Sequence, residues 1–500
     1  MAIALNERSV VVGWDFSTSA VKAVAFDLAG QVLAESRFLT DLWTADGVTE
    51  INLLMLEGQA RASARGIAAK LHKLDRLNDW VAAGISATHH TASRIDELGN
   101  PIRRAICWND QTLAKYHAEG EARLGGPAKV RQLLGGPWAE RYSLSHLVKD
   151  ETTLSRKDWL ATQWMQPHGS LAAGYLTGRF DCISVSSAAS TGLMNLRTQT
   201  WEPRMLGALA NAEYRTLAEG NLPKILDMMT PVGPLSESIA ADCRLPEGVR
   251  PLIFPTLDDQ AAGLVGGGAV AAGHVAIILG NSAVVNSSFA DIPSGDALDV
   301  MRLNWGPYLA MRCYNNGASF LNHVLPKKPN WDELERAASI VSAGCDGTYV
   351  LPFLISEPSV GVKSPMDQWI PNEPTAIGVR VRAVYESIAY LIALGLEAHR
   401  AAGQAVTQVT VSGGMARSEL MCEILASVLN VKLERLVSDE GPALGAAVGA
   451  LAGVIGGEPD VAIPQAVSML VKFKSPMLPK PAWVPMYREG LEKFRASISS

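Results

Sequence analysis

The sequence predicts an α/β protein, and three observations lead to this class. Short runs of apolar and β-branched residues alternate with longer segments in which apolar residues recur every three or four positions. Strands that alternate with helices in this way are typical of α/β folds. The balance of 48% hydrophobic and 19% charged residues is that of a globular protein, and 500 residues are enough for several domains. A strand–turn–strand pattern also occurs once in each half of the chain.

The elements of the first half follow from these patterns. A hairpin opens the chain, and a third strand, a long helix, a buried strand and another apolar run come after it. Their expected ranges are 10–12, 21–26, 29–36, 51–74, 80–88 and 105–112.

The middle of the chain, roughly 110–230, is predicted to be helical and rich in loops. The stretch 231–255 is rich in proline and turn residues and leads into a new apolar strand. Such shifts in composition usually mark linkers between domains. We therefore predict two domains, 1–248 and 249–500.

Charge and cysteine usage exclude several classes of protein. The net charge is −6 and no basic patch is present, so nucleic acid is not an expected partner. The six cysteines lack CxxC spacing, which indicates reduced thiols in a cytoplasmic protein rather than a disulfide frame or a zinc site. No signal peptide is visible. The apolar stretch 261–280 is near membrane-spanning length, but its glycines favour a small-residue helix that runs into a buried strand, so no membrane association is expected.

The turn of the first hairpin is rich in hydroxyl groups. Ser17, Thr18 and Ser19 lie in it, directly after a strand that carries Asp15. Clustered backbone N–H groups bind anions, and a carboxylate beside them is placed to hold Mg²⁺ together with phosphate oxygens. Taken alone, the segment is better explained by a plain β-turn with aspartate as a turn former.

A second hairpin of the same build is predicted at 278–286, and its turn contains Gly280, Asn281 and Ser282. Both turns share the tripeptide Ser-Ala-Val with the strand that follows. Two such hairpins that face each other are able to clamp one polyphosphate, which favours the anion-binding interpretation of both.

Glycines mark two further places in the second half. Gly413 and Gly414 lie between a predicted strand and a predicted helix, where backbone comes close to a ligand and the helix N-terminus favours negative charge. No Lys-Ser/Thr pair follows, so this is not a Walker A motif. Farther along, a predicted helix has a face of small residues that packs closely, formed by Gly441, Gly445, Gly449 and Gly453.

Two carboxylates open the predicted helix that follows the strand near 252–257. Asp258 occupies the expected N-cap position of this helix, where an aspartate is more often a cap than a catalyst. Asp259 is the additional carboxylate, and at a helix N-terminus it stays ionised at neutral pH, as a base that activates a hydroxyl must.

In this order, the segments resemble the FGGY family of carbohydrate kinases, within the sugar kinase/Hsp70/actin superfamily. The matching stretches include VVGWDFSTSAVKAVAFD, AICWNDQT, FPTLDDQAAG and SGGMARSEL, and they cover nearly the whole chain. The resemblance implies two ribonuclease-H-like lobes around a central cleft. Residues 1–248 form the expected sugar-binding lobe and residues 249–500 the ATP-binding lobe.

The resemblance also implies roles for single residues. Asp259 falls on the general base of the family, because Gln-Ala-Ala-Gly follows it. It is expected to accept the proton of a sugar hydroxyl while Mg²⁺, held by Asp15, and the two turns hold the γ-phosphate. The implied cofactors are ATP and Mg²⁺. The residues expected to bind ATP are Ser17, Thr18, Ser19, Gly280, Asn281, Ser282, Gly413, Gly414, Met415, Arg417 and Ser418.

In this family, the segment at Thr88–Thr91 contacts the hydroxyls of the substrate. Glycerol kinases carry Arg-Glu at its middle positions, whereas xylulokinases carry Gln-Met-His-Gly, which places His90 on their sugar-contacting histidine. A shared metal site is unfavourable, since neighbours on an extended chain point to opposite faces. We therefore expect a sugar contact from His90 and a scaffold role for His89 in this substrate loop. The other implied substrate contacts are Trp108, Asp110, Asp259 and Gln260.

Four departures from the family pattern suggest a specialised subgroup. Ser17-Thr18 replaces Gly-Thr, Asn281 replaces the threonine of Gly-Thr-Ser, and Thr112 stands where an arginine is usual. Residues 355–358 replace Ser-Gly-Glu-Arg.

The favoured function is ATP-dependent phosphorylation of a sugar hydroxyl, with a ketopentose such as D-xylulose as substrate. Two alternatives stay open: a kinase of another ketose or polyol, such as ribulose, erythritol or ribitol, and a weakly active sugar- or nucleotide-binding regulator on the same fold. The expected partners are a small-molecule sugar and ATP, with a homodimer as an open option for assembly.

Overall fold

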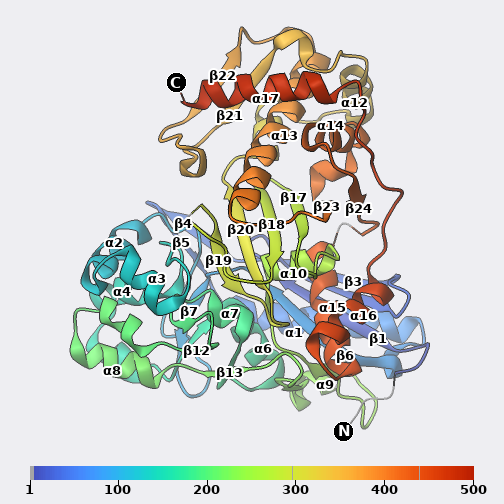
Figure 1. Ribbon diagram of the computed structural model, residues 1–500. Coiled ribbons are helices and arrows are strands. Elements are labelled where there is room, and N and C mark those ends of the chain that lie inside the picture. Colours follow the sequence, from blue (N-terminus) through green and yellow to red (C-terminus); the bar gives the residue numbers. More distant parts are fainter. Residues whose placement is uncertain (1–4, 296, 439, 500) are drawn as a thin grey trace. The chain divides into compact units, whose positions relative to one another are not determined.

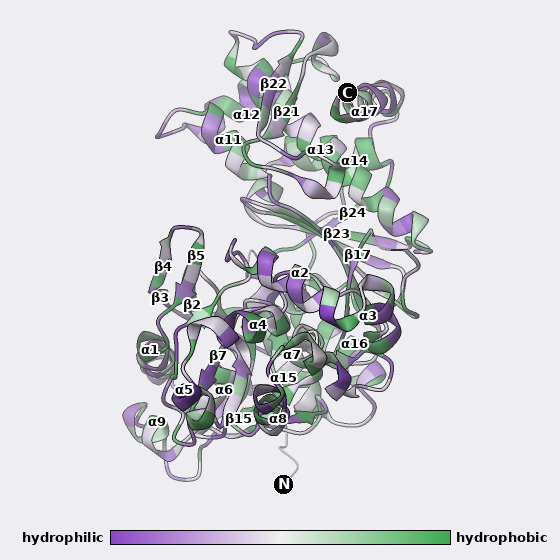
Figure 2. Ribbon diagram, turned by 90° about the vertical axis from the view of Figure 1, so that its left-hand side faces the viewer, coloured by the Kyte–Doolittle hydropathy of each residue, from purple (hydrophilic) through white to green (hydrophobic). Residues whose placement is uncertain are grey.

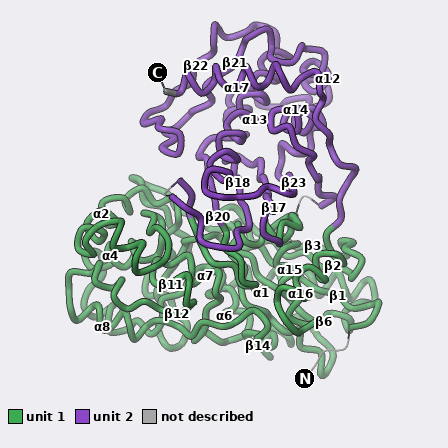
Figure 3. The backbone as a smooth tube through the Cα atoms, viewed as in Figure 1, with its two compact units in different colours: residues 1–270, 300–309, 440–471 green, residues 271–299, 310–439, 472–500 purple. Residues whose placement is uncertain are grey.

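The computed structural model describes residues 5–295, 297–438 and 440–499. The chain forms two compact units, each assembled from stretches that are far apart in the sequence (Figure 3). Unit 1 comprises 1–270, 300–309 and 440–471, and unit 2 comprises 271–299, 310–439 and 472–500.

Unit 1 is built on a mixed seven-stranded sheet of order β14-β15-β6-β1-β2-β3, with β16 also paired to β6. Its strands are β1 (Val10–Phe16), β2 (Ala20–Asp27), β3 (Val32–Leu39), β6 (Trp80–Ala87), β14 (Gly233–Pro234), β15 (Leu252–Ile253) and β16 (Leu257–Asp258). β1 pairs antiparallel with β2 and parallel with β6, and β16 also runs parallel to β6. Three neighbouring strands therefore end at the same edge of the sheet.

Helices cover both faces of this sheet (Figure 1). They are α1 (Leu53–Lys73), α6 (His168–Thr177), α10 (Asp259–Gly266), α15 (Gly441–Ile455) and α16 (Pro459–Leu470). Alternate residues of β1 face opposite sides. Trp14 lies on the side of α1 and donates from its indole Nε1 to Ser63 Oγ at 2.8 Å. Gly13 lies on the side of α15, where an added Cβ would be 1.7 Å from the carbonyl oxygen of Ala443. The expected close packing of the glycine-rich helix is confirmed.

The rest of unit 1 is a smaller sheet with a helical insert. The sheet has the order β4-β5-β8-β7-β9. Its strands are β4 (Leu42–Ala45), β5 (Val48–Ile51), β7 (Ala92–Ile95), β8 (Ala105–Ile106) and β9 (Trp164–Pro167). The helices of this part are α2 (Leu113–Leu124), α3 (Pro127–Leu134), α4 (Ser143–Thr153), α5 (Arg156–Ala161), α7 (Val185–Ala189), α8 (Ala212–Gly220) and α9 (Glu237–Asp242). The helical middle region is thus confirmed, although its short strands were not predicted: β9, the pair β10 (Cys182–Ser184) and β13 (Lys224–Leu226), and the pair β11 (Met194–Asn195) and β12 (Thr200–Trp201).

Unit 2 repeats the sheet order of unit 1. Strands β20-β18-β17-β23-β24 correspond to β3-β2-β1-β6-β15, with the first hairpin antiparallel and the next pair parallel in both. The strands are β17 (His274–Leu279), β18 (Ala283–Phe289), β20 (Tyr308–Tyr314), β23 (Gln408–Ser412) and β24 (Leu433–Arg435), with β19 (Asp299–Arg302) beside β20. The predicted internal repeat is therefore present in the topology.

The helices of unit 2 are α11 (Ala318–Val324), α12 (Trp331–Ser339), α13 (Ile377–Ala401), α14 (Glu419–Leu429) and α17 (Val484–Ser499), and β21 (Tyr349–Phe353) pairs with β22 (Met366–Ile370). α13 contributes many residues to the hydrophobic core of this unit. Figure 2 shows the apolar character of α14, in contrast to the polar helix α5 of unit 1. A turn of 3-10 helix, Gly414–Arg417, precedes α14.

The division differs from the predicted boundary between 248 and 249. The proline-rich stretch before β15 is an edge of the first sheet rather than a linker, and α10 continues the same unit. The helix with the glycine face also belongs to unit 1, because α10 and α15 touch backbone to backbone. A Cβ at Gly445 would lie 1.8 Å from the carbonyl oxygen of Ala262, and one at Gly266 would lie 2.0 Å from that of Gly441.

The apolar stretch 261–280 becomes the end of α10 and the strand β17, as predicted. Among the described residues, no helix combines the length and the hydropathy needed to cross a membrane.

Candidate functional site

Polar residues gather where β1, β6 and β16 end in unit 1. The register places both Asp15 of β1 and Leu257 of β16 opposite Ser86 of β6. The carboxyl ends of strands are the usual ligand-binding edge of open α/β sheets. Ser86 Oγ donates to Asp15 Oδ1 at 3.0 Å. Burial, together with the nearby Asp259 carboxylate, raises the pKa of Asp15 to about 7.

His89 lies between the two adjacent aspartates. Its Nδ1 is 2.9 Å from Asp259 Oδ1, and its Nε2 is 3.4 Å from Asp258 Oδ2. The side chains of His89 and Asp258 are 5% and 3% exposed, whereas that of Asp259 is 26% exposed. Asp259 is therefore the carboxylate that an incoming molecule can reach.

Burial by itself lowers the pKa of His89, but the carboxylates of Asp258 and Asp259 outweigh it and raise the pKa above its ordinary value. The expectation of a scaffold role for His89 did not include this contact with both carboxylates.

Asp258 occupies the N-cap position of α10, but its side chain makes no capping hydrogen bond. It instead accepts a hydrogen bond from Ser187 Oγ at 2.6 Å. The predicted capping role of Asp258 is therefore wrong in this respect. Its carboxylate instead contacts the ring of His89 and the hydroxyl of Ser187 in α7.

The side chain of His90 is buried, and its backbone adopts the left-handed conformation, with φ of 59°. Its ring stacks on Tyr142 with centroids 4.4 Å apart, and its Nδ1 is 3.0 Å from the carbonyl oxygen of Ser190. Burial lowers its pKa well below the ordinary value, so the ring is neutral and Nδ1 is the donor. Its Nε2 and the Tyr142 hydroxyl are buried without a hydrogen-bond partner among the described residues. Both atoms therefore have hydrogen-bonding capacity that no described residue uses.

Asp110 is held by groups of its own unit. Lys149 Nζ donates to Asp110 Oδ2 at 2.9 Å, and it also donates to Thr112 Oγ1 at 2.8 Å. Lys149 of α4 thus brings a positive charge to both Asp110 and Thr112. Trp108, close by in the chain, is partly buried.

Gln260 follows Asp259 in α10 and is partly buried. Its backbone N–H lies 3.3 Å from His89 Nδ1. The structure thus brings Asp15, His89, Asp259 and Gln260 together.

The turn of the first hairpin is stabilised by its own hydroxyl groups. Ser17 Oγ accepts from the backbone N–H of Ala20 at 3.1 Å and from that of Ser19 at 3.3 Å. Thr18 is partly buried and Ser19 is exposed. Ser17 is therefore engaged within the turn, and part of the turn faces solvent.

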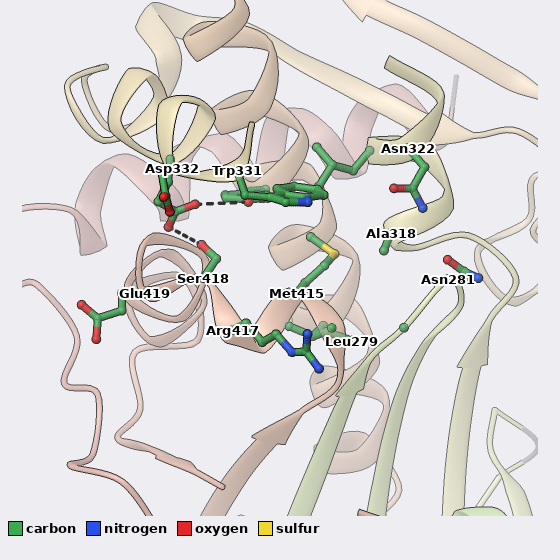
Figure 4. A pocket seen from close by; sticks show the side chains of 15 residues that line it. Leu279, Asn281, Ala318, Asn322, Trp331, Asp332, Met415, Arg417, Ser418 and Glu419 are labelled. Atoms are coloured by element: carbon green, nitrogen blue, oxygen red, sulfur yellow. Dashed lines mark hydrogen bonds between the residues drawn. The ribbon is translucent and has the colours of Figure 1, made fainter. Parts of the chain in front are cut away.

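Unit 2 contains a pocket of about 840 Å³ (Figure 4). Six of the residues predicted to bind ATP line it: Gly280, Asn281, Gly414, Met415, Arg417 and Ser418. Gly413 and Ser282 are not among the lining residues. Gly413 acts through the backbone, since φ is 95° and a Cβ would lie 2.5 Å from the carbonyl oxygen of Leu279. Glycine at this position lets the Gly414–Arg417 turn approach the end of β17.

Helix α12 contributes a wall of this pocket that was not predicted from the sequence. Trp331 lies at the start of α12, is 49% exposed, and faces the side of the pocket that carries Met415 in Figure 4. Glu335 accepts hydrogen bonds from Ser418 Oγ at 2.5 Å and from the backbone N–H of Leu420 at 3.1 Å. In the sequence, Asn330 signals the start of this helix, because it caps α12 by accepting a hydrogen bond from the backbone N–H of Glu333.

Comparisons with known proteins agree with this geometry. Residues 10–266 match the N-terminal domain of the FGGY family of carbohydrate kinases, and residues 302–454 match its C-terminal domain. The chain is 24% identical to a xylulose kinase of Staphylococcus epidermidis over 470 residues, which is 89% of this chain and 88% of the relative.

A glycerol kinase of a Geobacter species is 27% identical over 475 residues, 88% of this chain and 89% of the relative. A solved structure of a xyloylose kinase from Brucella ovis superposes with a TM-score of 0.83 over 98% of both chains at 22% identity. That likeness shows the fold.

Proposed function

The chain belongs to the FGGY family of carbohydrate kinases and is an ATP-dependent carbohydrate kinase, and on this premise we propose that it phosphorylates a ketopentose such as D-xylulose. The observation that carries the proposal is the cluster of Asp15, His89 and Asp259 at one edge of the unit 1 sheet, with the ring of His90 5.1 Å from that of His89.

We assign the base to Asp259. His89 contacts one of its oxygens, and the carboxylate keeps enough exposure for a sugar hydroxyl to approach. The hydroxyl proton passes to Asp259, the oxygen forms a bond to the γ-phosphorus of ATP, and the bond to the β-phosphate oxygen breaks to release ADP. Positioning and charge stabilisation supply most of the rate in such transfers.

The nucleotide is assigned to the pocket of unit 2 and the metal to Asp15. The pocket has an apolar and aromatic wall beside the Gly414–Arg417 turn, which suits a purine nucleotide. A partly buried carboxylate whose pKa is raised to about 7 gains from a nearby cation, and Mg²⁺ binds one or two carboxylates together with phosphate oxygens. Asp15 therefore fits Mg²⁺, which would neutralise charge on the transferred phosphate when bound.

The substrate assignment depends on His90 and on the relatives. His90 offers a neutral ring with an acceptor nitrogen, which suits a sugar hydroxyl. Several relatives are xylulose kinases, while the Arg-Glu pair that glycerol kinases carry is replaced by His89 and His90. We further propose a cytoplasmic location, where ATP is supplied and the six free cysteines stay reduced.

The test is a coupled assay of ADP release with MgATP and a panel of D-xylulose, ribulose, erythritol, ribitol and glycerol. We expect D-xylulose to give the highest kcat/KM. Asp259→Asn should lower kcat by about 10²–10⁴-fold, the usual contribution of a positioned base. Asp291→Asn, at an exposed position, is the matched control and should keep full activity. ADP release that no sugar raises, or full turnover by Asp259→Asn, would contradict the proposal.

A further inference from the structure

We propose that His89 is a positioning residue, an imidazolium clamped between Asp258 and Asp259 that orients the Asp259 carboxylate toward the sugar hydroxyl. The inference rests on the proposed role of Asp259 as the base. His89 does not itself receive the proton from the sugar in this scheme. It holds one oxygen of Asp259 and thereby fixes the direction of the other.

The geometry of the ring carries the inference. Both nitrogens face carboxylate oxygens, Asp259 Oδ1 at 2.9 Å and Asp258 Oδ2 at 3.4 Å. Only the Nδ1 contact is a hydrogen bond; among the described residues, His89 Nε2 and Asp258 Oδ2 are buried without a hydrogen-bond partner, so Asp258 acts on the ring through its charge. A neutral ring protonated at Nδ1 would turn the lone pair of Nε2 toward this carboxylate, whereas an imidazolium presents positive charge to both carboxylates. The ring and Asp258 are almost fully buried, and in such surroundings a hydrogen bond between charged groups is strong and directional.

The far end of the clamp is anchored. Asp258 accepts from Ser187 Oγ at 2.6 Å, and its backbone N–H donates to Ser186 Oγ at 3.2 Å. Both serines belong to α7, whose side chains here are buried. Since Asp258 does not cap its own helix, its carboxylate is available to fix the ring of His89.

Charge balance gives a second reason for the imidazolium. Asp258 and Asp259 are adjacent in the chain, and Asp15 feels the charge of Asp259 as well. Several carboxylates this close repel one another when ionised. A positive ring between two of them offsets this repulsion. Burial and the positive charge of Arg141 act in the opposite direction, and the two carboxylates outweigh them.

A neutral ring is the competing arrangement. The backbone N–H of Gln260 lies 3.3 Å from His89 Nδ1, and in a neutral ring this nitrogen would accept that hydrogen bond. The contact between Nδ1 and Asp259 Oδ1 is shorter, at 2.9 Å, which favours a protonated Nδ1. The two arrangements differ in one proton, so the protonation state of the ring decides between them.

The first measurement determines directly which ring nitrogens of His89 are protonated. The full-length protein labelled with ¹⁵N-histidine is studied by NMR at pH 7.5, and the His89 signals are assigned by their loss in His89→Gln. We expect both ring nitrogens of His89 to be protonated in the wild-type protein and the ring to become neutral in Asp258→Asn. A wild-type ring in which either Nδ1 or Nε2 is unprotonated would overturn the proposal, and this measurement does not depend on any enzymatic activity.

The second measurement is kinetic, with D-xylulose and MgATP. His89→Met, which keeps a comparable size without a donor, should lower kcat about tenfold or more while the KM for ATP is unchanged. His89→Gln should recover part of the loss through one amide donor. His89→Met/Asp258→Asn should lose little more than His89→Met alone, because both changes act through Asp259.

His117→Gln is the control, since His117 bonds to the carbonyl oxygen of Trp138 elsewhere in unit 1, and it should keep wild-type kcat. A raised sugar KM with unchanged kcat in His89→Met would make His89 a substrate contact instead and would overturn the proposal. If the wild type shows no sugar-dependent ADP release, the proposed function fails, while the NMR result still decides whether the clamp exists.

Discussion

Asp15, Asp258 and Asp259 stand at the ends of neighbouring strands, and their surroundings give each a different environment. Asp15 accepts a hydrogen bond from Ser86. Burial, together with the nearby Asp259 carboxylate, raises the pKa of Asp15. Burial also raises the pKa of Asp258, against the effects of His89 and Ser187. The side chain of Asp259 is more exposed than those of His89 and Asp258, which it accompanies. We propose that these three chemically identical groups serve different roles: Asp15 as metal ligand, Asp258 as anchor of His89 and Asp259 as base.

The pKa of Asp15 leads to a prediction about stability. A carboxyl whose pKa rises on folding, from 3.8 to about 7, binds its proton more tightly in the folded state. Stability from this group is present at low pH and is lost as the pH rises through this range. Asp15→Asn removes that dependence, so the Tm of the variant minus that of the wild type should increase by a few degrees from pH 4.5 to pH 7 and then level off. Thermal melts without ATP or Mg²⁺ measure it, and a difference that stays constant with pH would contradict the pKa assignment.

Lys149 and Asp110 form a buried pair whose disruption should be costly. Their side chains are 9% and 0% exposed, so Lys149→Met leaves a buried carboxylate without its cation. We expect a loss of about 3–5 kcal/mol in the free energy of unfolding, as for other broken buried pairs. Asp110→Asn combined with Lys149→Met should recover much of this loss in urea unfolding. An equally large loss in the double variant would show that packing rather than charge is at stake.

At the scale of elements, α15 shows how small residues position the site. The helix lies against β1 and β6 closely enough that Gly84, like Gly13, has no room for a Cβ, which would be 1.9 Å from the carbonyl oxygen of Ala446. The same helix holds α10, whose first residue is Asp259. The close packing of three elements therefore fixes Asp259, the proposed base, relative to the strand that carries Asp15.

Gly445→Ala tests this packing. The new Cβ would lie 1.8 Å from the carbonyl oxygen of Ala262, so α10 and α15 must separate. We expect a loss of about 1–3 kcal/mol in the free energy of unfolding, the usual cost of overpacking, together with a lower kcat because α10 moves. Gly58→Ala is the matched control: it is exposed within α1, with nothing within 4 Å, and should stabilise by about 0.5–1 kcal/mol. Equal effects of the two changes would contradict the packing argument.

At the scale of the whole molecule, the predicted α/β class with two lobes of the ribonuclease-H-like kind is confirmed by the repeated sheet order and by the likeness to sugar kinases. The chain passes repeatedly from one unit to the other, so neither unit is one continuous stretch. Unit 1 needs residues 440–471, which supply α15 and α16 to its sheet.

This connectivity predicts how fragments behave. A fragment of residues 1–270 exposes the face of β1 and β6 that α15 covers and should aggregate, because large exposed apolar surfaces associate. The same fragment joined through a flexible linker to residues 440–471 should be more soluble and should melt cooperatively. Solubility and circular dichroism of both fragments measure this. A cooperative transition in the shorter fragment would show that α15 is dispensable for unit 1.

Much of the fold and part of the site could be predicted from local patterns. The two hairpins, the long first helix, the strand before His89 and the helix that begins at Asp259 all have periodicities or turn residues that act within a few positions of the chain. The hydroxyl-rich turn and the Gly413-Gly414 turn were visible for the same reason, since their conformations are set by the residues in them.

The sequence by itself determined the family, the α/β class and the order of the elements, because these depend on local periodicity and on motifs that are continuous in the chain. Only the tertiary structure decided that α15 belongs to the first unit, that Lys149 pairs with Asp110, and that His89 lies between Asp258 and Asp259. These contacts join residues far apart in sequence through packing and charge, for which no local pattern carries a signal.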